Sequence, residues 1–200
     1  MPAADRFGPV AGLRIRTVAT LPRVDVNEDG GPRTTKPLRS AVDVARYASG
    51  LTEAVVCLDV ILARGRVTPL RLVEVCAALP RARGCAQAAR ATELADGRAE
   101  SPQESRLRVG LVLRGLTSFV PQYVVRHNGR FVARADLAHR RRKLALEYDG
   151  RWHAAAAQLD RDRRRLNALA EAGWRVLFVT APDLYRLDEL ADEVRAALGR

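Results

Sequence analysis

Three acidic residues in the second half of the chain combine residue types and spacing that could bind a metal ion. Asp136 lies near the end of one expected strand, and Glu147 and Asp149 lie on the next. Residues two apart on a strand share a face, so Glu147 and Asp149 are expected on the same side. If the two strands pair, Asp136 comes within side-chain reach of both. Carboxylates held so close either raise a pKa or bind a cation, and Mg²⁺ or Mn²⁺ suits oxygen ligands of this kind.

The elements that would position these acids are predicted by local patterns. Ser101-Pro102-Gln103-Glu104 is typical of a helix start, with an N-cap, a proline at the first position and an acid at the third. Asn128-Gly129 between alternating runs is a strong hairpin signal. The expected order is α-β-β-β-α-β-α, with a helix over 101–114, strands over 119–126, 131–138 and 143–149, a helix over 153–172, a strand over 174–180 and a helix over 182–198.

The rest of the chain is expected to form two further parts. Residues 1–35 have little periodicity and form an extended or turn-rich lead-in, with a short extended candidate over 13–19. Residues 36–98 have apolar residues at helical spacing and are predicted to be mainly helical. The third part then spans 99–200. With 48% hydrophobic residues, the chain can bury a substantial core.

Composition also argues against several classes of protein. No apolar run approaches the roughly 20 residues of a membrane span, and the first 12 residues lack the apolar core of a signal peptide. We therefore expect no membrane partner and a cytoplasmic location. Cys57, Cys76 and Cys85 are odd in number and lie outside any CxxC spacing, which favours reduced thiols over a zinc site.

The net charge of +11 is concentrated around the acidic residues. Residues 101–165 contain 15 Lys and Arg against 6 Asp and Glu, whereas residues 1–100 contain 15 against 11. A basic field around a few acids suits a polyanionic substrate brought to a metal site. The alternative is a solvated surface whose arginines reflect a GC-rich coding bias.

An ordered series of motifs resembles a known family. The series is Ser101 to Ser105, Ala133 to Asp136, Leu146 to His153, Arg161 to Leu166 and Gly173 to Val176. It is similar to uncharacterised bacterial domains related to the very-short-patch-repair endonuclease, within the PD-(D/E)xK nuclease class, over about residues 101–184. The resemblance implies a restriction-endonuclease-like α/β fold and metal-dependent hydrolysis of DNA.

The resemblance also implies which residues form the site. The class has an acid on the first helix, an Asp on one strand and a Glu-x-Lys on the next, which fall here on Glu104, Asp136 and Glu147. Asp136 and Glu147 would hold the metal, and Glu104 or His153 would steer a proton. Asp149 stands where the class has lysine, which removes the usual cation beside the attacking water.

Each of the first three residues also has a structural interpretation. Glu104 is placed to close a capping box with Ser101, in which its carboxylate only accepts from a backbone N–H. Asp136 and Glu147 could instead form ion pairs with Arg134 or Lys143.

The remaining candidates also keep two interpretations. Asp149 precedes Gly150 and could simply form a turn, and His153 could cap its helix rather than transfer a proton. The side chains of Arg161 and Arg164, with Arg165, could bind DNA phosphates or form a solvated helix face. Arg165 is expected to pair with Asp162, three residues earlier.

Two functions remain open at this point. One is a metal-dependent DNA endonuclease using Mg²⁺ or Mn²⁺. The other is a catalytically inactive nucleic-acid-binding module, because such nuclease-like domains resemble the C-terminal part of abortive-infection-type antitoxins, which carry an N-terminal winged helix. The second interpretation predicts a toxin or antitoxin partner. The sequence leaves the oligomeric state open.

Overall fold

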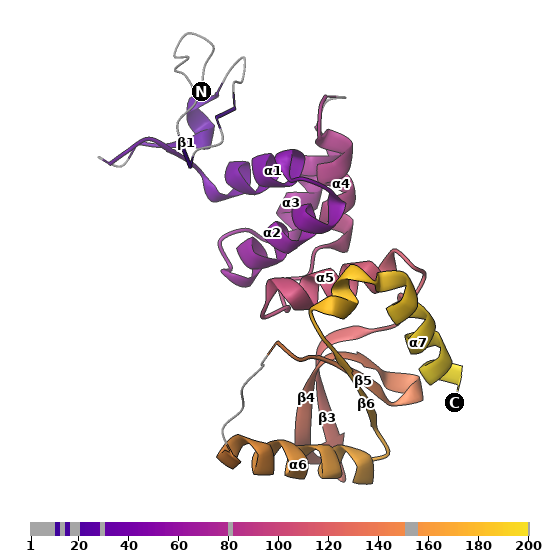
Figure 1. Ribbon diagram of the computed structural model, residues 1–200. Helices are drawn as coiled ribbons and strands as arrows, with labels where there is room; N and C mark the ends of the chain where they lie inside the picture. The colour runs from indigo at the N-terminus through magenta and orange to yellow at the C-terminus, as the bar shows by residue number, and fades with distance from the viewer. Residues whose placement is uncertain are drawn as a thin grey trace.

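The fold is mixed α/β, as the sequence predicts, and is seen in a computed structural model (Figure 1). The structure describes residues 11–12, 15–16, 21–28, 31–79, 82–150 and 156–199, with side chains from residue 162 onward in the last stretch. The extended candidate over 13–19 therefore lies largely outside the described residues. Within the lead-in, the strands β1 (Val26–Asn27) and β2 (Thr34–Thr35) pair antiparallel, after a 3-10 turn, η2 (Arg23–Asp25).

Four helices follow, α1 (Pro37–Tyr47), α2 (Leu51–Ala63), α3 (Pro69–Ala77) and α4 (Cys85–Leu94). Local signals place their starts: Thr68 caps α3 by accepting from the backbone N–H of Arg71, and Pro69 occupies its first turn. The four helices share one apolar core, in which Ala41, Val55 and Leu58 are fully buried. The predicted helical region is thus present.

The second half contains α5 (Pro102–Val112), β3 (Val120–His127), β4 (Arg130–His139), β5 (Leu144–Tyr148), α6 (Ala156–Glu171), β6 (Arg175–Val179) and α7 (Leu187–Gly199). Two 3-10 turns lie between them, η3 (Arg140–Arg142) and η4 (Pro182–Tyr185). This is the predicted α-β-β-β-α-β-α order. The expected final helix over 182–198 is divided, because η4 and the non-helical Arg186 precede α7.

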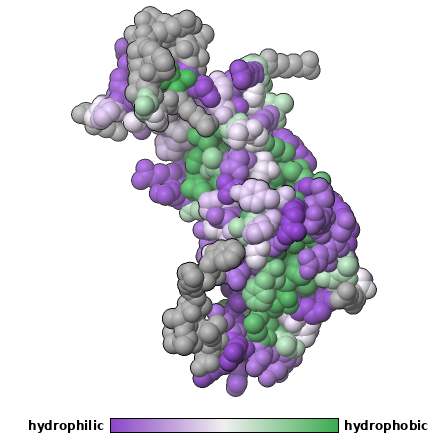
Figure 2. All heavy atoms as spheres, in the orientation of Figure 1, coloured by the Kyte–Doolittle hydropathy of each residue, from purple (hydrophilic) through white to green (hydrophobic). Residues whose placement is uncertain are grey.

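The sheet has the order β3-β4-β5-β6. The first three strands pair antiparallel, and β5 and β6 pair parallel, so α6 is the crossover between them. Figure 1 shows α6 along one face of the sheet and α5 with α7 on the other. Figure 2 shows hydrophobic side chains over the sheet, flanked by hydrophilic ones, on the face it presents.

Alternation along β5 divides its residues between the two faces, as the sequence predicts. Leu144 and Leu146 are buried in the core beneath α5 and α7. Ala145 is buried in the core on the α6 side. Glu147 follows the same period as Ala145, which directs it toward α6. None of the described helices is long and apolar enough to cross a membrane.

Candidate active site

The predicted acids Asp136 and Glu147 come together at one end of the β4–β5 pair. The last paired residues there are Leu137 and Leu146, and Asp136 and Glu147 are the next residues on the two strands. One Asp136 oxygen, Oδ2, accepts a hydrogen bond of 2.8 Å from the backbone N–H of Tyr148. Glu147 Oε1 accepts from the guanidinium of Arg165 on α6. One oxygen of each carboxylate is thus fixed by the protein.

The contacts of Glu104 agree with its interpretation as a cap and also connect it to β3. Its backbone N–H donates to Ser101 Oγ at 3.2 Å, and that hydroxyl donates to Glu104 Oε1 at 2.8 Å. Glu104 Oε2 accepts from the Glu100 backbone N–H at 3.0 Å, as a capping carboxylate does. The same oxygen also accepts from Gln122 Nε2 on β3 at 2.7 Å. Glu104 therefore ties α5 to the edge strand beside Asp136.

Gln122 is a site residue that the sequence pattern does not reveal. Its neighbours Pro121 and Tyr123 pair with Leu137 and Ala135, so Gln122 lies opposite Asp136. Its φ of 51° falls in the left-handed region, which is unfavourable for a side chain of this length. Its Oε1 is buried and has no hydrogen-bond partner among the described residues. A strained backbone and a buried amide oxygen without a partner are both features that occur at functional sites.

Burial makes the site costly to ionise. Burial raises the pKa of Asp136, and the nearby Glu104 carboxylate raises it further. The hydrogen bond from the Tyr148 N–H and the charge of Arg165 lower it, but by less. Burial also raises the pKa of Glu147, against the opposing effect of Arg165 and with a further contribution from Asp136. Two neighbouring carboxylates with raised pKa values are an arrangement that a cation stabilises.

The sequence-based partners of these acids are wrong, because tertiary contacts replace them. Arg134 pairs with Glu100 at 2.7 Å, and Lys143 donates to the backbone carbonyl of Ala172 at 2.9 Å. Arg165 does not make its expected pair with Asp162. It bonds Glu147 and the carbonyl of Arg134 instead.

Arg165 supplies the positive charge that Asp149 cannot. Asp149 is exposed at the end of β5, and its backbone N–H donates to Val179 at 2.8 Å. As a carboxylate, it brings no positive charge to the site. Arg165 brings one from α6, because its guanidinium contacts Glu147 and lowers the electrostatic cost of ionising both Asp136 and Glu147.

The other predicted site residues are spread more widely. Arg164 is exposed on α6, away from the bond that Arg165 makes. His153 and the side chain of Arg161 lie outside the described residues. The three cysteines, Cys57, Cys76 and Cys85, are free thiols, and the last two are buried.

The site offers two carboxylates and one amide oxygen to a metal ion. No group of three or more His, Cys, Asp or Glu side chains in the described part of the chain could hold a metal by itself. Mg²⁺ needs fewer, because it commonly binds through one or two carboxylates and keeps several waters. Asp136, Glu147 and the partnerless Oε1 of Gln122 fit this donor set.

The chain is similar to two curated proteins. Uncharacterized protein MT2308 of Mycobacterium tuberculosis (strain CDC 1551 / Oshkosh) and uncharacterized protein Rv2248 of Mycobacterium tuberculosis (strain ATCC 25618 / H37Rv) are each 33% identical to it over 184 residues. The match covers 90% of this chain and 66% of each relative, so the chain spans just under two thirds of their length. No protein-family model matches it, and no solved structure matches it significantly. The resemblance to the very-short-patch-repair-related family therefore stays a prediction.

The raised pKa of Asp136 predicts a dependence of stability on pH. A carboxyl whose pKa is raised by folding contributes stability that is fully present below its unfolded pKa and is lost as pH rises through the folded one. Asp136→Asn keeps an acceptor for the Tyr148 N–H but does not titrate. Above an unfolded pKa of about 3.9, its unfolding free energy should therefore rise relative to that of the wild type. Urea denaturation between acidic and neutral pH measures this difference, and parallel curves would contradict it.

Proposed function

We propose that the chain is a metal-dependent DNA endonuclease of the very-short-patch-repair-like type, with a restriction-endonuclease-like core. The observation that carries this proposal is that the acids Asp136 and Glu147 directly follow the last β4–β5 pair, with Gln122, whose Oε1 is buried and partnerless, next to Asp136 on β3. Two neighbouring carboxylates, one of them held by the guanidinium of Arg165, suit phosphodiester hydrolysis better than a purely structural role. The concentration of positive charge in residues 101–165 supports a polyanionic substrate.

The chain's own residues have distinct roles in this proposal. Asp136, Glu147 and Gln122 would hold Mg²⁺ or Mn²⁺, which when bound lowers the pKa of water and stabilises charge on a phosphate. Glu104 orients Gln122 through its 2.7 Å hydrogen bond. Arg165 is placed on α6 to stabilise negative charge on the phosphate, and so would supply the cation that lysine supplies in the resembled class. His153 remains a candidate for proton transfer, and Asp149 remains a candidate for contact with the metal.

A specific contact also favours the second candidate function, an inactive nucleic-acid-binding module of a toxin-antitoxin or regulatory protein. Arg165 already neutralises Glu147, so the pair could be structural and need no metal. In that case the protein would bind DNA through its basic surface and cut nothing.

Plasmid nicking by the purified protein separates the two functions. Supercoiled DNA is incubated with protein and Mg²⁺, Mn²⁺ or EDTA, and relaxed and linear forms are quantified. The endonuclease proposal predicts cleavage with either metal and none with EDTA. DNA binding without cleavage under all three conditions would support the inactive module.

A further inference from the structure

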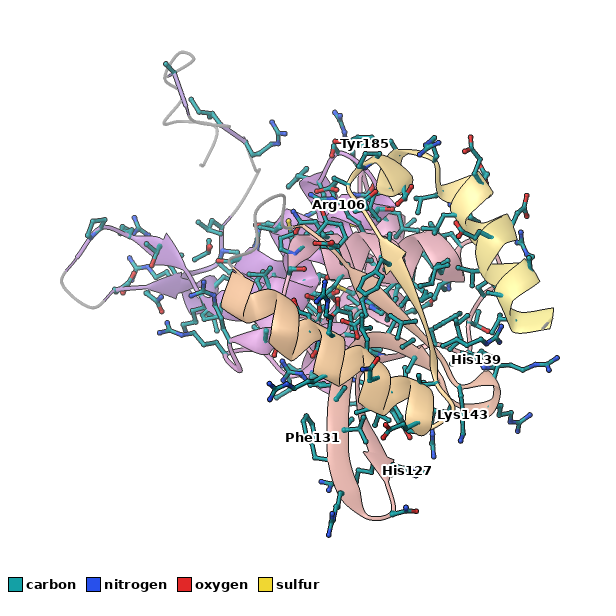
Figure 3. All side chains as sticks on the ribbon, turned by 60° about the horizontal axis from the view of Figure 1, so that its bottom comes forward. Arg106, His127, Phe131, His139, Lys143 and Tyr185 are labelled. Atoms are coloured by element: carbon teal, nitrogen blue, oxygen red, sulfur yellow. The ribbon has the colours of Figure 1, made fainter. Side chains whose placement is uncertain are left out.

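A basic groove lies at the other end of the α6 side of the sheet and belongs to none of the roles above. Its volume is about 940 Å³. We define the basic groove by its lining residues, which are Ser118, Tyr123, Arg126, His127, His139, Arg140, Arg141, Arg142, Lys143, Ala172 and Trp174. Figure 3 shows His139 and Lys143 near one end of α6, and His127 on the β3–β4 hairpin.

Positive charge converges on the basic groove from separate segments. Five of its lining residues are Lys or Arg, two are His, and none of these described residues is acidic. The cations come from the end of β3 and from the η3 turn, and the C-terminal end of α6 closes the groove. A run of arginines in sequence is often only a solvated face. Here the fold gathers cations around a hollow, which focuses their field on whatever lies in it.

The backbone of the η3 turn fixes how its arginines project. His139 Nδ1 accepts from the backbone N–H of Arg142 at 3.2 Å and so caps the turn. Lys143 then adopts a left-handed conformation with a φ of 45°, and its ammonium group bonds the Ala172 carbonyl at the end of α6. Lys143 is therefore occupied as a helix cap. Arg140, Arg141 and Arg142 remain exposed at the rim.

Aromatic side chains form the floor of the basic groove. The rings of Tyr123 and Trp174 lie 5.6 Å apart, and the Arg140 guanidinium lies 5.5 Å from the centre of the Tyr123 ring. Trp174 is only 8% exposed, so it supports the floor and offers no free stacking face. The contact with Tyr123 holds Arg140 in place, which lowers the entropy cost of binding an anion.

The dimensions of the basic groove suit a polymer. Ser118 and His127 lie at opposite ends of the segment that contains β3, at most about 30 Å apart at strand spacing. Ala172 lies about 10 Å along α6 from Arg165, which contacts the acidic site. A backbone lying in the groove could therefore continue toward Asp136 and Glu147.

We infer that the basic groove binds the sugar-phosphate backbone of DNA through Arg126, Arg140, Arg141 and Arg142. The choice of DNA as the polyanion rests on the proposed function, whereas the groove itself does not depend on catalysis. The described lining offers guanidinium groups that pair well with phosphate oxygens and no acidic side chain that would repel them. On this inference the arginines of the η3 turn, together with Arg126, are DNA contacts in addition to those predicted on α6.

A binding assay in EDTA tests this inference without cleavage. The Kd for a short labelled duplex is measured by fluorescence anisotropy at several salt concentrations. For Arg140→Ala/Arg141→Ala/Arg142→Ala, affinity at about 0.1 M salt should fall at least tenfold, and the slope of log Kd against log salt should fall by about 2 to 3. The control Arg64→Ala/Arg66→Ala/Arg71→Ala removes the same charge from exposed positions of the helical region. It should change both quantities much less.

Equal losses in the two triple variants would overturn the inference, because they would indicate a diffuse effect of net charge. Tripolyphosphate that competes as strongly as DNA at equal phosphate concentration would also overturn it, in favour of a small-anion site. If the triple variant does not fold, Arg141→Ala/Arg142→Ala keeps the contact between Arg140 and Tyr123 and should lower the slope by about 2. If the wild type binds DNA through the groove but does not cleave it, this inference holds and the proposal of an endonuclease is wrong.

Discussion

Glu147→Gln is expected to lower metal-dependent cleavage of DNA by roughly 10³-fold, because losing a metal ligand removes several kcal/mol of charge stabilisation. The amide has the shape of the carboxylate and keeps an oxygen for the Arg165 guanidinium. The fold should therefore survive, and only the charge is removed. Initial rates of plasmid nicking in Mg²⁺, with circular dichroism and thermal melting as checks on folding, measure the effect.

A matched control for Glu147→Gln is available close by. Glu100 contributes to the raised pKa of Asp136, but it is about half exposed and pairs with Arg134 across the surface. Glu100→Gln should therefore change the rate only slightly. Wild-type rates in the Glu147 variant would eliminate the proposed metal site. Binding to DNA in EDTA should be unchanged or slightly tighter, because one negative charge is lost near the phosphates.

The order of elements and the meeting of two acids could be predicted because local patterns determine both. Asn128-Gly129 sets the β3–β4 hairpin, and both residues adopt the positive φ values that this turn requires. Alternation along β5 then separates Leu146 from Glu147, and the pairing of neighbouring strands brings Asp136 alongside. Each step depends on residues that are close in sequence.

The parts of the site that were missed depend on distant residues. Gln122 has no sequence signal, because its left-handed conformation is held by a hydrogen bond that it donates to Glu104 on another element, α5. Helical spacing suggested that Arg165 pairs with Asp162, but the sheet beneath α6 offers a buried partner in Glu147. The basic groove similarly joins segments that no local pattern connects.

One missed residue did carry a signal, which is an acid inside an apolar helix. Asp59 lies among the buried Val55, Leu58 and Leu62 of α2 and is 1% exposed. Nothing in the charge pattern of α2 gives it a partner on the same helix. A lone acid on an apolar face predicts a buried pair with another element, and here that element is α5, which also carries Glu104.

Asp59→Ala is expected to lower the free energy of unfolding by about 3 to 5 kcal/mol, because it leaves the buried Arg108 without its charge partner. Asp59 accepts from Arg108 Nη2 at 2.7 Å, from Ser105 Oγ at 2.6 Å and from the Asp96 backbone N–H at 2.6 Å. Burial raises the pKa of Asp59 although all three donors lower it, so burying the ionised carboxylate costs free energy. Urea denaturation followed by circular dichroism measures the loss.

The neighbouring pair between the same two helices gives the control for Asp59. Arg106 on α5 bonds Glu53 on α2 at 2.8 Å, but both side chains are more than one third exposed, so Glu53→Ala should cost about 1 kcal/mol or less. Asp59→Leu/Arg108→Met should recover much of the loss, because apolar residues of similar volume replace a buried pair well. If Asp59→Ala costs no more than Glu53→Ala, the buried pair does not hold α5 against the helical region. If it costs several kcal/mol, the placement of Glu104, and through it Gln122, depends on a contact that lies outside the sheet.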